Sequence, residues 1–363
     1  MTSTERASSA AAVVELRSDT FTLPTARMLE EMTRAPLGDD VYGEDPTARE
    51  LEELAASLLG KEDACFMPSG TMGNLAAILA HCPRGTKALA GAESDIYVYE
   101  AGGASYCGGV IVEPVANAAD GTMALADIEA AFPEDPEDPQ FALPALLCVE
   151  NPQNRCGGRV LPLEYLAGVQ ALARARKVAV HLDGARIFNA ALALDVPVRV
   201  IAGYADSVQF CLSKGLSAPV GSMVVGSADF IRSVRRIRKM LGGGMRQAGV
   251  LAAAGLVALR EMTARLGDDH RTARRLAEGL AALPGVVVEP VETNMVFFRV
   301  DTPHLTQAEF IERSWNEGVR LAELGRGRIR AATHAGVSEA GVDRALSVFR
   351  DILAPAAVLS SRP

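Results

Sequence analysis

Residues 207–222 read SVQFCLSKGLSAPVGS, an apolar run followed by one lysine, Lys214, and a turn. The run 208–212 is short and partly β-branched, which predicts a buried strand, and the glycine, serine and proline after it predict a turn. Lys214 therefore ends a strand, where open α/β sheets bind their ligands. Burying an unpaired ammonium costs several kcal/mol. An ion pair at a strand end and an amine held for covalent chemistry both remain open for this lysine.

A second strand is predicted at residues 177–183, KVAVHLD, before the segment DGAR and a helical pattern. It brings Asp183 and Arg186 to the same sheet edge as Lys214. Asp183 alone could cap the following helix. Together, the amine and the carboxylate match what pyridoxal 5'-phosphate needs, which is an amine for its aldehyde and an acid that keeps its pyridine nitrogen protonated.

A phosphate-binding turn is predicted at residues 67–74, MPSGTMGN, where Ser69, Gly70 and Thr71 open an apolar helix. Backbone N–H groups at a helix start bind phosphate, and glycine allows close approach of the backbone. Such a turn is common and weak evidence alone. The order of phosphate turn, aspartate and lysine is nevertheless the order found in aspartate-aminotransferase-type enzymes of fold type I.

The chain resembles the low-specificity L-threonine aldolase family, within the β-eliminating lyase and threonine aldolase group, over residues 16–350. The motifs that carry the resemblance are LRSDTFTLP (16–24), GDDVYGEDPT (38–47), PSGTMGN (68–74), YEAGG (99–103), HLDGAR (181–186), CLSKGL (211–216) and RKMLGGGMRQ (238–247). The resemblance implies an α/β, aspartate-aminotransferase-like fold of type I. Its large domain would hold a mostly parallel seven-stranded sheet, and a small α+β domain would follow.

The resemblance also implies roles for individual residues. Lys214 would hold the cofactor covalently and Asp183 would pair with its pyridine nitrogen. The other expected cofactor ligands are Ser69, Gly70, Thr71, Arg186 and, from a neighbouring subunit, Arg246. The substrate carboxylate would be held by Ser18, Arg186 and Arg330, because planar guanidinium groups suit bidentate binding. Without the resemblance, a helix-terminal ion pair for Arg186 and a solvated charge for Arg330 would be favoured.

Two departures from the family pattern concern the expected histidines. Asp95, in AESDIYVYEAGG, stands where the family carries a histidine that stacks on the cofactor, and Gln153, in ENPQN, replaces a histidine near the substrate hydroxyl. Asp95 could move a proton on the face opposite Lys214, deprotonate a β-hydroxyl, or bind a loop. Gln153 cannot act as a base but could orient substrate. We therefore expect Lys214, Asp95 and Gln153 as catalytic residues and an altered substrate.

The expected reaction is reversible aldol cleavage of a β-hydroxy-α-amino acid to glycine and an aldehyde. This outcome requires the Cα–Cβ bond to stand perpendicular to the cofactor ring. Alignment of the Cα–H bond would instead give a racemase, an epimerase or a β-eliminating lyase. An inactive homologue that serves as a binding subunit is a further alternative, which retention of Lys214, Asp183, Arg186 and Arg330 disfavours.

Bulk composition agrees with such an enzyme. The 363 residues hold 36 basic and 45 acidic side chains, and the net charge of −9 disfavours nucleic-acid binding. The six cysteines show no metal-ligand spacing, so we expect reduced thiols, no metal and a cytoplasmic location. No apolar run approaches the roughly 20 residues that span a membrane. The Ser/Ala-rich start resembles a tail more than an export signal.

The predicted organisation follows from the same patterns. We expect a tail (1–13), an N-terminal arm (14–34), a cofactor-binding large domain (35–250), a small C-terminal domain (251–355) and a final tail (356–363). Strands are predicted near residues 88, 110, 146, 178, 208 and 223 and at 286–289 and 295–300, with helices at 248–265, at 269–283 and from Ser338. The resemblance implies a homo-oligomer, a dimer or tetramer with shared active sites.

Overall fold

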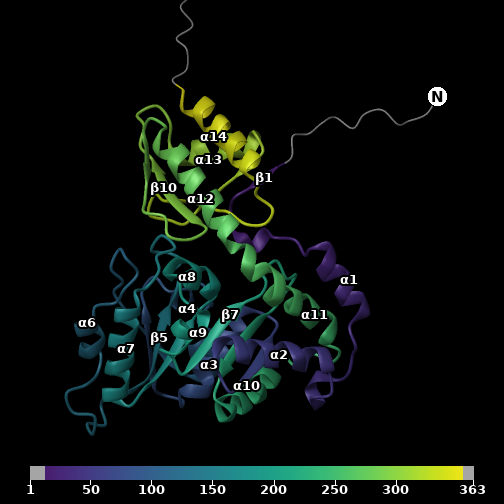
Figure 1. Cartoon of the computed structure of the whole chain (residues 1–363). Coiled ribbons are helices and arrows are strands. Elements are labelled where there is room, and N and C mark those ends of the chain that lie inside the picture. Colours follow the sequence, from purple (N-terminus) through teal and green to yellow (C-terminus); the bar gives the residue numbers. More distant parts are fainter. Residues whose placement is uncertain (1–12, 355–363) are drawn as a thin grey trace, which may run out of the picture.

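The computed structural model describes residues 13–354, and its largest element is a seven-stranded sheet (Figure 1). The spatial order is β2-β8-β7-β6-β5-β3-β4. The strands are β2 (Asp63–Met67), β3 (Lys87–Gly91), β4 (Ile111–Val115), β5 (Pro144–Glu150), β6 (Ala179–Asp183), β7 (Ser207–Cys211) and β8 (Ser222–Gly226). Strands β3 to β7 pair in parallel, and β8 is antiparallel to β7 and β2. The predicted mostly parallel sheet is confirmed, and β2 is the strand that the sequence analysis missed.

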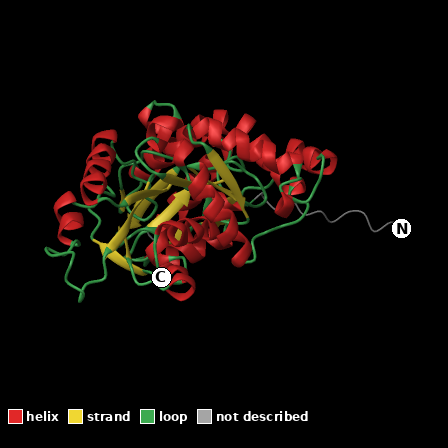
Figure 2. Cartoon of the chain, turned by 90° about the horizontal axis from the view of Figure 1, so that it is seen from below, coloured by secondary structure: helices red, strands yellow, loops and turns green. Residues whose placement is uncertain are grey.

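Helices cover both faces of this sheet, as Figure 2 shows. The longer ones are α2 (Pro46–Leu59), α3 (Gly70–His81), α7 (Leu163–Arg176), α8 (Ile187–Leu194), α10 (Ala228–Met240) and α11 (Gly249–Val257). Shorter helices are α4 (Asp95–Val98), α5 (Gly103–Gly108), α6 (Leu125–Ala130) and α9 (Val198–Ala202). The helix predicted after the phosphate turn is therefore present as α3.

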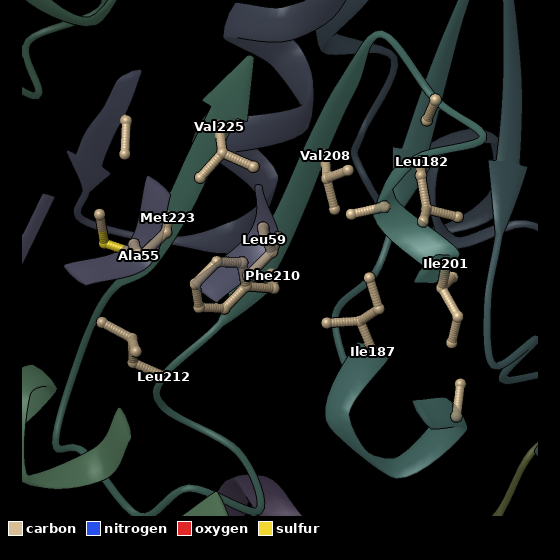
Figure 3. Packing of buried hydrophobic residues seen from close by; sticks show 14 of the residues in the cluster. Ala55, Leu59, Leu182, Ile187, Ile201, Val208, Phe210, Leu212, Met223 and Val225 are labelled. Atoms are coloured by element: carbon tan, nitrogen blue, oxygen red, sulfur yellow. The ribbon is translucent and has the colours of Figure 1, made fainter. Parts of the chain in front are cut away.

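Side chains alternate along the central strands, so each strand serves two different layers. Val208 and Phe210 of β7 point into the large core, together with Met223 and Val225 of β8 (Figure 3). The intervening residues face α3, where they meet a second, smaller apolar cluster that includes Val224. Polar residues at alternate positions of β6 and β7 are consequently buried beneath α3 and not within the large core.

The small domain is built on a four-stranded antiparallel sheet, in the order β12-β13-β10-β9. Its strands are β9 (Val286–Val288), β10 (Met295–Val300), β12 (Ala322–Glu323) and β13 (Ile329–Ala332), and its helices are α12 (Leu266–Ala281), α13 (Gln307–Asn316) and α14 (Glu339–Leu353). The aromatic rings of Phe298, Phe310 and Phe349 pack together in its core. The predicted strands and the terminal helix, capped by Ser338, are confirmed.

The N-terminal arm connects the two cores. Strand β1 (Val14–Glu15) pairs in parallel with β11 (Val319–Arg320) of the small domain. Leu16 belongs to the core of the small domain, whereas Met28 of α1 (Ala26–Arg34) belongs to the large core. Figure 1 shows α1 beside α11. The predicted tails lie outside the described residues, apart from Val13.

One continuous helical segment, residues 249–281, passes from the large core to the small one. Two helices separated by a break were predicted here. Instead, α11 continues through a wider turn at Ala258–Met262 and a tight turn at Thr263–Arg265 into α12. The large core extends to Leu266, later than the predicted limit at residue 250, and Ala273 is the first residue of this segment in the small core. Within residues 13–354, every helix is too short or too polar to traverse a bilayer.

Candidate active site

The carboxyl edge of the main sheet gathers the polar groups of the candidate site. Glu150 ends β5, Asp183 ends β6, and Lys214 follows the end of β7. The parallel register pairs Glu150 with Asp183, and Asp183 with Gln209 of β7. The structure thus brings the predicted amine and the predicted carboxylate to neighbouring strand ends, as the strand patterns indicated.

Lys214 lies in a tight turn that the N-terminal arm holds in position. Its carbonyl oxygen accepts hydrogen bonds from the Thr22 hydroxyl at 2.8 Å and from the Ser217 N–H at 2.9 Å. Burial favours the neutral amine, but the Cys211 sulfur and the carboxylates of Asp95 and Asp183 outweigh it and raise the pKa of Lys214. These neighbouring groups therefore favour the protonated form of the amine.

Asp183 is a buried carboxylate, 3% exposed, with partners on both oxygens. Oδ2 accepts a hydrogen bond from Nδ2 of Asn74 at 2.8 Å, and Oδ1 accepts one from the Ala185 N–H at 3.1 Å. Burial raises the pKa of Asp183, while the charge of Lys214 and the Asn74 hydrogen bond act in the opposite direction. These contacts fix the carboxylate in one orientation at the sheet edge.

The start of α3 forms a cradle beside this carboxylate. Ser69 caps the helix, since its hydroxyl accepts a hydrogen bond from the Met72 N–H at 3.2 Å. A Cβ atom at Gly70 would lie 3.0 Å from the Cys211 sulfur and 3.1 Å from the Gln209 amide nitrogen, so a larger residue here would push these side chains of β7 away from the helix. Ser69 and Thr71 are exposed. The free N–H groups at the helix start suit a phosphate.

Arg186 is held by a carboxylate of the N-terminal arm. Its Nε and Nη2 donate to the two carboxylate oxygens of Asp19, both at 2.7 Å, and Asp19 is fully buried. Burial raises the pKa of Asp19, but Arg186 and the charges of Lys214 and Arg330 together outweigh burial and hold this pKa well below its ordinary range. Ser18 is also buried, and its hydroxyl accepts from the Thr20 N–H at 3.3 Å. Arg186 therefore meets a partner that the prediction did not include.

Arg330, on β13 of the small domain, carries a buried charge without a carboxylate partner. Its Nη1 donates to Oδ1 of Asn154 at 2.7 Å and its Nη2 to the Arg17 carbonyl at 3.1 Å, while its Nε has no partner among the described residues. Burial and the nearby charge of Arg186 lower the pKa of Arg330 to about 10. An incoming carboxylate would compensate this charge.

Asp95 lies at the start of α4 and is linked to Arg330 through one amide. Nδ2 of Asn154 donates to Oδ1 of Asp95 at 3.1 Å, while the other end of that amide accepts from Arg330. The Asp95 N–H donates to Oε2 of Glu150 at 2.7 Å. Burial, together with the charges of Asp95 and Asp183, raises the pKa of Glu150 well above its ordinary value.

Gln153 makes no hydrogen bond to these groups in the described structure, and its predicted catalytic and substrate-binding role stays a prediction. The side chain is 1% exposed. Its Nε2 donates to the Glu93 carbonyl at 2.7 Å, and its Oε1 accepts from the Cys156 N–H at 2.6 Å. Both ends of the amide are thus bound to the main chain, where Gln153 stabilises its own loop.

Arg246 pairs at the surface with Asp39 at 2.9 Å, and its side chain is 54% exposed. It therefore does not contribute to the cluster around Lys214 in its own chain. The prediction that it serves a neighbouring subunit stays a prediction.

Four residues of the site were missed by the sequence analysis: Asp19, Asn74, Glu100 and Asn154. Each lies within a quoted segment, namely LRSDT, PSGTMGN, YEAGG or ENPQN. Glu100 accepts a hydrogen bond from Nδ2 of Asn74 at 2.8 Å, and burial together with Asp183 raises its pKa to about 8. Their position in these motifs was the available signal, but short polar side chains beside glycine and proline are also typical of turns.

A mostly parallel sheet with a lysine, a buried carboxylate and a helix start at its carboxyl edge defines a pyridoxal-phosphate enzyme of fold type I. The donor set fits this cofactor, because the first N–H groups of α3 and the buried carboxylate of Asp183 lie at the same sheet edge as Lys214.

The comparisons with known proteins agree with this class. The chain matches the model of the beta-eliminating lyase family over residues 15–303. It is 48% identical to the probable low-specificity L-threonine aldolase 2 of Arabidopsis thaliana over 343 residues, which cover 93% of this chain and 97% of that protein. It is 44% identical to the low specificity L-threonine aldolase of Escherichia coli (strain K12), over 94% of this chain and 100% of that protein. The solved structure of Leishmania major threonine aldolase superposes with a TM-score of 0.80 at 22% identity, covering 94% of this chain and 100% of that chain.

The chain belongs to the beta-eliminating lyase family, in its threonine aldolase group. It is accordingly a lyase that uses pyridoxal 5'-phosphate.

Proposed function

We propose that the protein catalyses reversible aldol cleavage of a β-hydroxy-α-amino acid to glycine and an aldehyde. The observation that carries this proposal is the mutual electrostatic influence of six charged groups near one edge of the main sheet. Asp95 and Asp183 act on Lys214, and Arg186, Lys214 and Arg330 act on Asp19. A cofactor-holding amine and carboxylate-binding cations are thus close enough to serve one small amino acid.

The cofactor would be held by groups of three kinds. Lys214 provides the amine for its aldehyde, Asp183 the carboxylate opposite its pyridine nitrogen, and the start of α3 with Ser69, Gly70 and Thr71 the phosphate cradle. Arg246 of a second copy would add a cation to the phosphate. When bound, pyridoxal phosphate withdraws electrons from a bond at the substrate Cα.

The substrate carboxylate would bind chiefly to Arg330. Its charge is buried and lacks an ion-pair partner in the described part of the chain, whereas Asp19 already occupies two donors of Arg186. Arg186 keeps a further N–H group for the same carboxylate, and Ser18 lies beside Asp19. Holding the carboxylate fixes the torsion about the amino nitrogen, which decides the bond at Cα that is weakened.

Asp95 would accept the proton of the β-hydroxyl. Its carboxylate is oriented by Nδ2 of Asn154, and no side-chain cation binds it directly among the contacts of the described residues. A carboxylate in this position differs from the imidazole of the family pattern, and Gln153 does not replace it. We therefore also propose a substrate other than threonine itself.

Racemisation is the second candidate reaction, because the site contains two groups that can exchange a proton, the amine of Lys214 and the carboxylate of Asp95. Lys214 and Asp95 influence each other electrostatically, and two bases around one Cα would suffice for inversion. We place the aldol reaction first, because the relatives at 44–48% identity are named low-specificity L-threonine aldolases.

We further propose a cytoplasmic homo-oligomer with shared sites. All six cysteines are unpaired, which suits a reducing compartment. Leu23 and Tyr42, in two of the motif segments, are 80% and 75% exposed, and a second copy would cover them.

The decisive experiment incubates the purified holoenzyme with a panel of β-hydroxy-α-amino acids in deuterated water and records glycine release, Cα exchange and inversion. Glycine release that equals substrate loss supports the aldolase. Exchange with inversion and no glycine supports the racemase. Ordinary turnover of L-threonine would remove the case for an altered substrate.

A further inference from the structure

Four buried side chains and the half-buried His81 form a continuous hydrogen-bond network that ends on Asp183. Nε2 of His81 lies 2.8 Å from the Ser207 hydroxyl, which lies 2.9 Å from Nδ1 of His181. Nε2 of His181 lies 3.1 Å from Oδ1 of Asn74, whose Nδ2 donates to Asp183 at 2.8 Å. These five residues are called the Asp183 network below.

The network follows from the strand and helix periodicities. His181 and Asp183 alternate with the core residues Val180 and Leu182 on β6, so they face α3. On α3, Asn74 and His81 are two turns apart and lie on one stripe. Gly73 lets the helix approach, because a Cβ atom there would lie 2.8 Å from Cγ of Gln209.

The chemistry of each group fixes the direction of every hydrogen bond. Asn74 must present its N–H groups to the carboxyl oxygens of Asp183 and Glu100, so its carbonyl faces His181. Nε2 of His181 must then carry the proton, which leaves Nδ1 as an acceptor for the Ser207 hydroxyl. Ser207 in turn must accept from Nε2–H of His81. All donors therefore point toward Asp183.

Both imidazoles are neutral, as this direction requires. Burial lowers the pKa of His181 to about 3, with a contribution from His81, and lowers the pKa of His81 to about 4, against the charge of Asp206. The His81 ring also stacks on Phe230 with the ring centres 4.4 Å apart. At neutral pH each ring thus has one proton and one acceptor nitrogen.

We propose that His81, Ser207, His181 and Asn74 are positioning residues whose aligned hydrogen bonds keep Asp183 ionised and oriented toward the cofactor nitrogen. The inference rests on the proposed role of Asp183 as the partner of that nitrogen. Aligned donors polarise one another, so a distant hydroxyl strengthens the final bond to the carboxylate. Partners of this kind orient and tune the group that they contact.

The network stabilises negative charge without conducting protons. The amide of Asn74 donates and accepts but does not pass a proton on, so it interrupts transfer between His181 and Asp183. Its second N–H binds Glu100, whose raised pKa favours the protonated form. Lys214 and Asp95 face the same carboxylate, and only the lysine favours its ionised form.

The first test needs no variant. In the wild-type holoenzyme labelled with ¹⁵N-histidine, long-range ¹H–¹⁵N correlations report the tautomer of each ring. His81→Gln and His181→Gln proteins assign the two signals. We expect neutral rings protonated at Nε2 for both residues between pH 6 and 8. A proton on Nδ1 of His181, or an imidazolium there, would overturn the proposal.

The second test removes one hydroxyl far from the cofactor. Ser207→Ala should weaken binding of pyridoxal phosphate about three- to tenfold and shift the pH dependence of its visible absorbance. Ser314→Ala is the matched control, because Ser314 is equally buried but bonds only the Phe310 carbonyl in the small domain. Cofactor affinity and pH dependence that match those of Ser314→Ala would contradict the proposal.

A second pair of variants controls for an effect of misfolding on cofactor binding. Ser207→Thr and Ser207→Val have the same shape, and only the threonine keeps the hydroxyl. We expect the Ser207→Thr protein to bind pyridoxal phosphate about three- to tenfold more tightly than the Ser207→Val protein. Equal affinities of the two variants would refute the network. The Asp183→Asn protein distinguishes the proposed role of Asp183 from the proposed network. Unchanged cofactor binding in this variant would refute the role of Asp183 as the partner of the cofactor nitrogen. The tautomers of His81 and His181 in the wild-type protein test the network independently.

Discussion

Asp19 of the N-terminal arm and Arg186 of the large domain form a buried, bidentate ion pair. The two donor–acceptor distances are 2.7 Å, and the side chains are 0% and 5% exposed. Nδ2 of Asn294, from the small domain, donates to the same carboxylate at 3.3 Å. The pair therefore joins three parts of the chain at the edge of the site.

Asp19→Asn should destabilise the protein and weaken substrate binding together. Removing one partner of a buried ion pair typically costs about 3–5 kcal/mol, because the other charge is left uncompensated. Urea denaturation measures the loss, and the KM for the amino acid should rise because Arg186 is no longer oriented. Asp343→Asn is the control, since it breaks an exposed pair with Arg275 and should cost about 1 kcal/mol or less. Equal losses for the two variants would argue against a special role for Asp19.

Arg330→Met should raise KM roughly 10- to 100-fold, because a hydrogen bond to a charged group contributes about 1.5–3 kcal/mol. Steady-state kinetics with the preferred amino acid measure the change. Arg328→Met, in the same segment, removes an arginine that pairs with Glu289 and should leave KM within about twofold. A loss in kcat at constant KM would contradict carboxylate binding by Arg330.

Asp95→Asn should separate aldol cleavage from chemistry at the Cα–H bond. The amide cannot accept the β-hydroxyl proton, so the kcat for glycine release should fall about 10²- to 10⁴-fold. Exchange of the Cα hydrogen of glycine should persist, as measured by NMR in deuterated water. If the variant released glycine at the wild-type rate, Asp95 would not be the base.

Lys214→Ala should abolish covalent attachment of the cofactor. Borohydride reduction followed by mass spectrometry should find the cofactor on the peptide that contains Lys214 in the wild-type protein and on no peptide of the variant. Lys177→Asn, which changes an exposed lysine, should retain the label. Label on a different lysine of the wild-type protein would refute the assignment.

His270 should make stability depend on pH in a predictable direction. Nδ2 of Asn189 donates to its Nε2, and burial, with Arg274 nearby, lowers the pKa of His270 to about 4. The unfolded chain, with a histidine pKa of about 6.5, binds the proton first, so this histidine destabilises the fold as the pH falls from about 6.5 to 4. The total loss is about 3 kcal/mol.

His270→Gln removes this titration and keeps an acceptor for Asn189. Its unfolding free energy, followed by urea denaturation between pH 7 and 4, should decline less steeply than that of the wild type. Parallel pH profiles for the two proteins would show that His270 is not buried in its neutral form.

The strand patterns of the sequence predict most of the fold because short apolar runs, bounded by turn residues, mark buried strands such as β6 and β7. Lys214 and Asp183 were found in this way, as residues that end apolar runs. The hydrogen bonds of Gln153 to main-chain groups of Glu93 and Cys156 could not be predicted, because contacts of that kind leave no trace in the sequence. Asp19 was overlooked since a buried ion pair with a residue far along the chain resembles an ordinary turn aspartate.

The residue at which the helical segment changes cores could not be predicted for a related reason. Residues 249–281 form one helical segment that changes cores partway. A break was expected at residues 266–268, where α12 instead begins directly after the wider turn at 258–262 and the tight turn at 263–265. Helical periodicity predicts the helices of this segment, but it does not show whether their apolar face packs against the large core or the small one.

The position of Asp19 also has a consequence during biosynthesis. Its partners Arg186 and Asn294 lie 167 and 275 residues further along the chain. The arm therefore leaves the ribosome long before these partners are synthesised. Asp19 cannot form its complete set of contacts until the small domain has emerged. The reaction centre can be completed only near the end of translation, so truncated chains that still contain Lys214 should be inert.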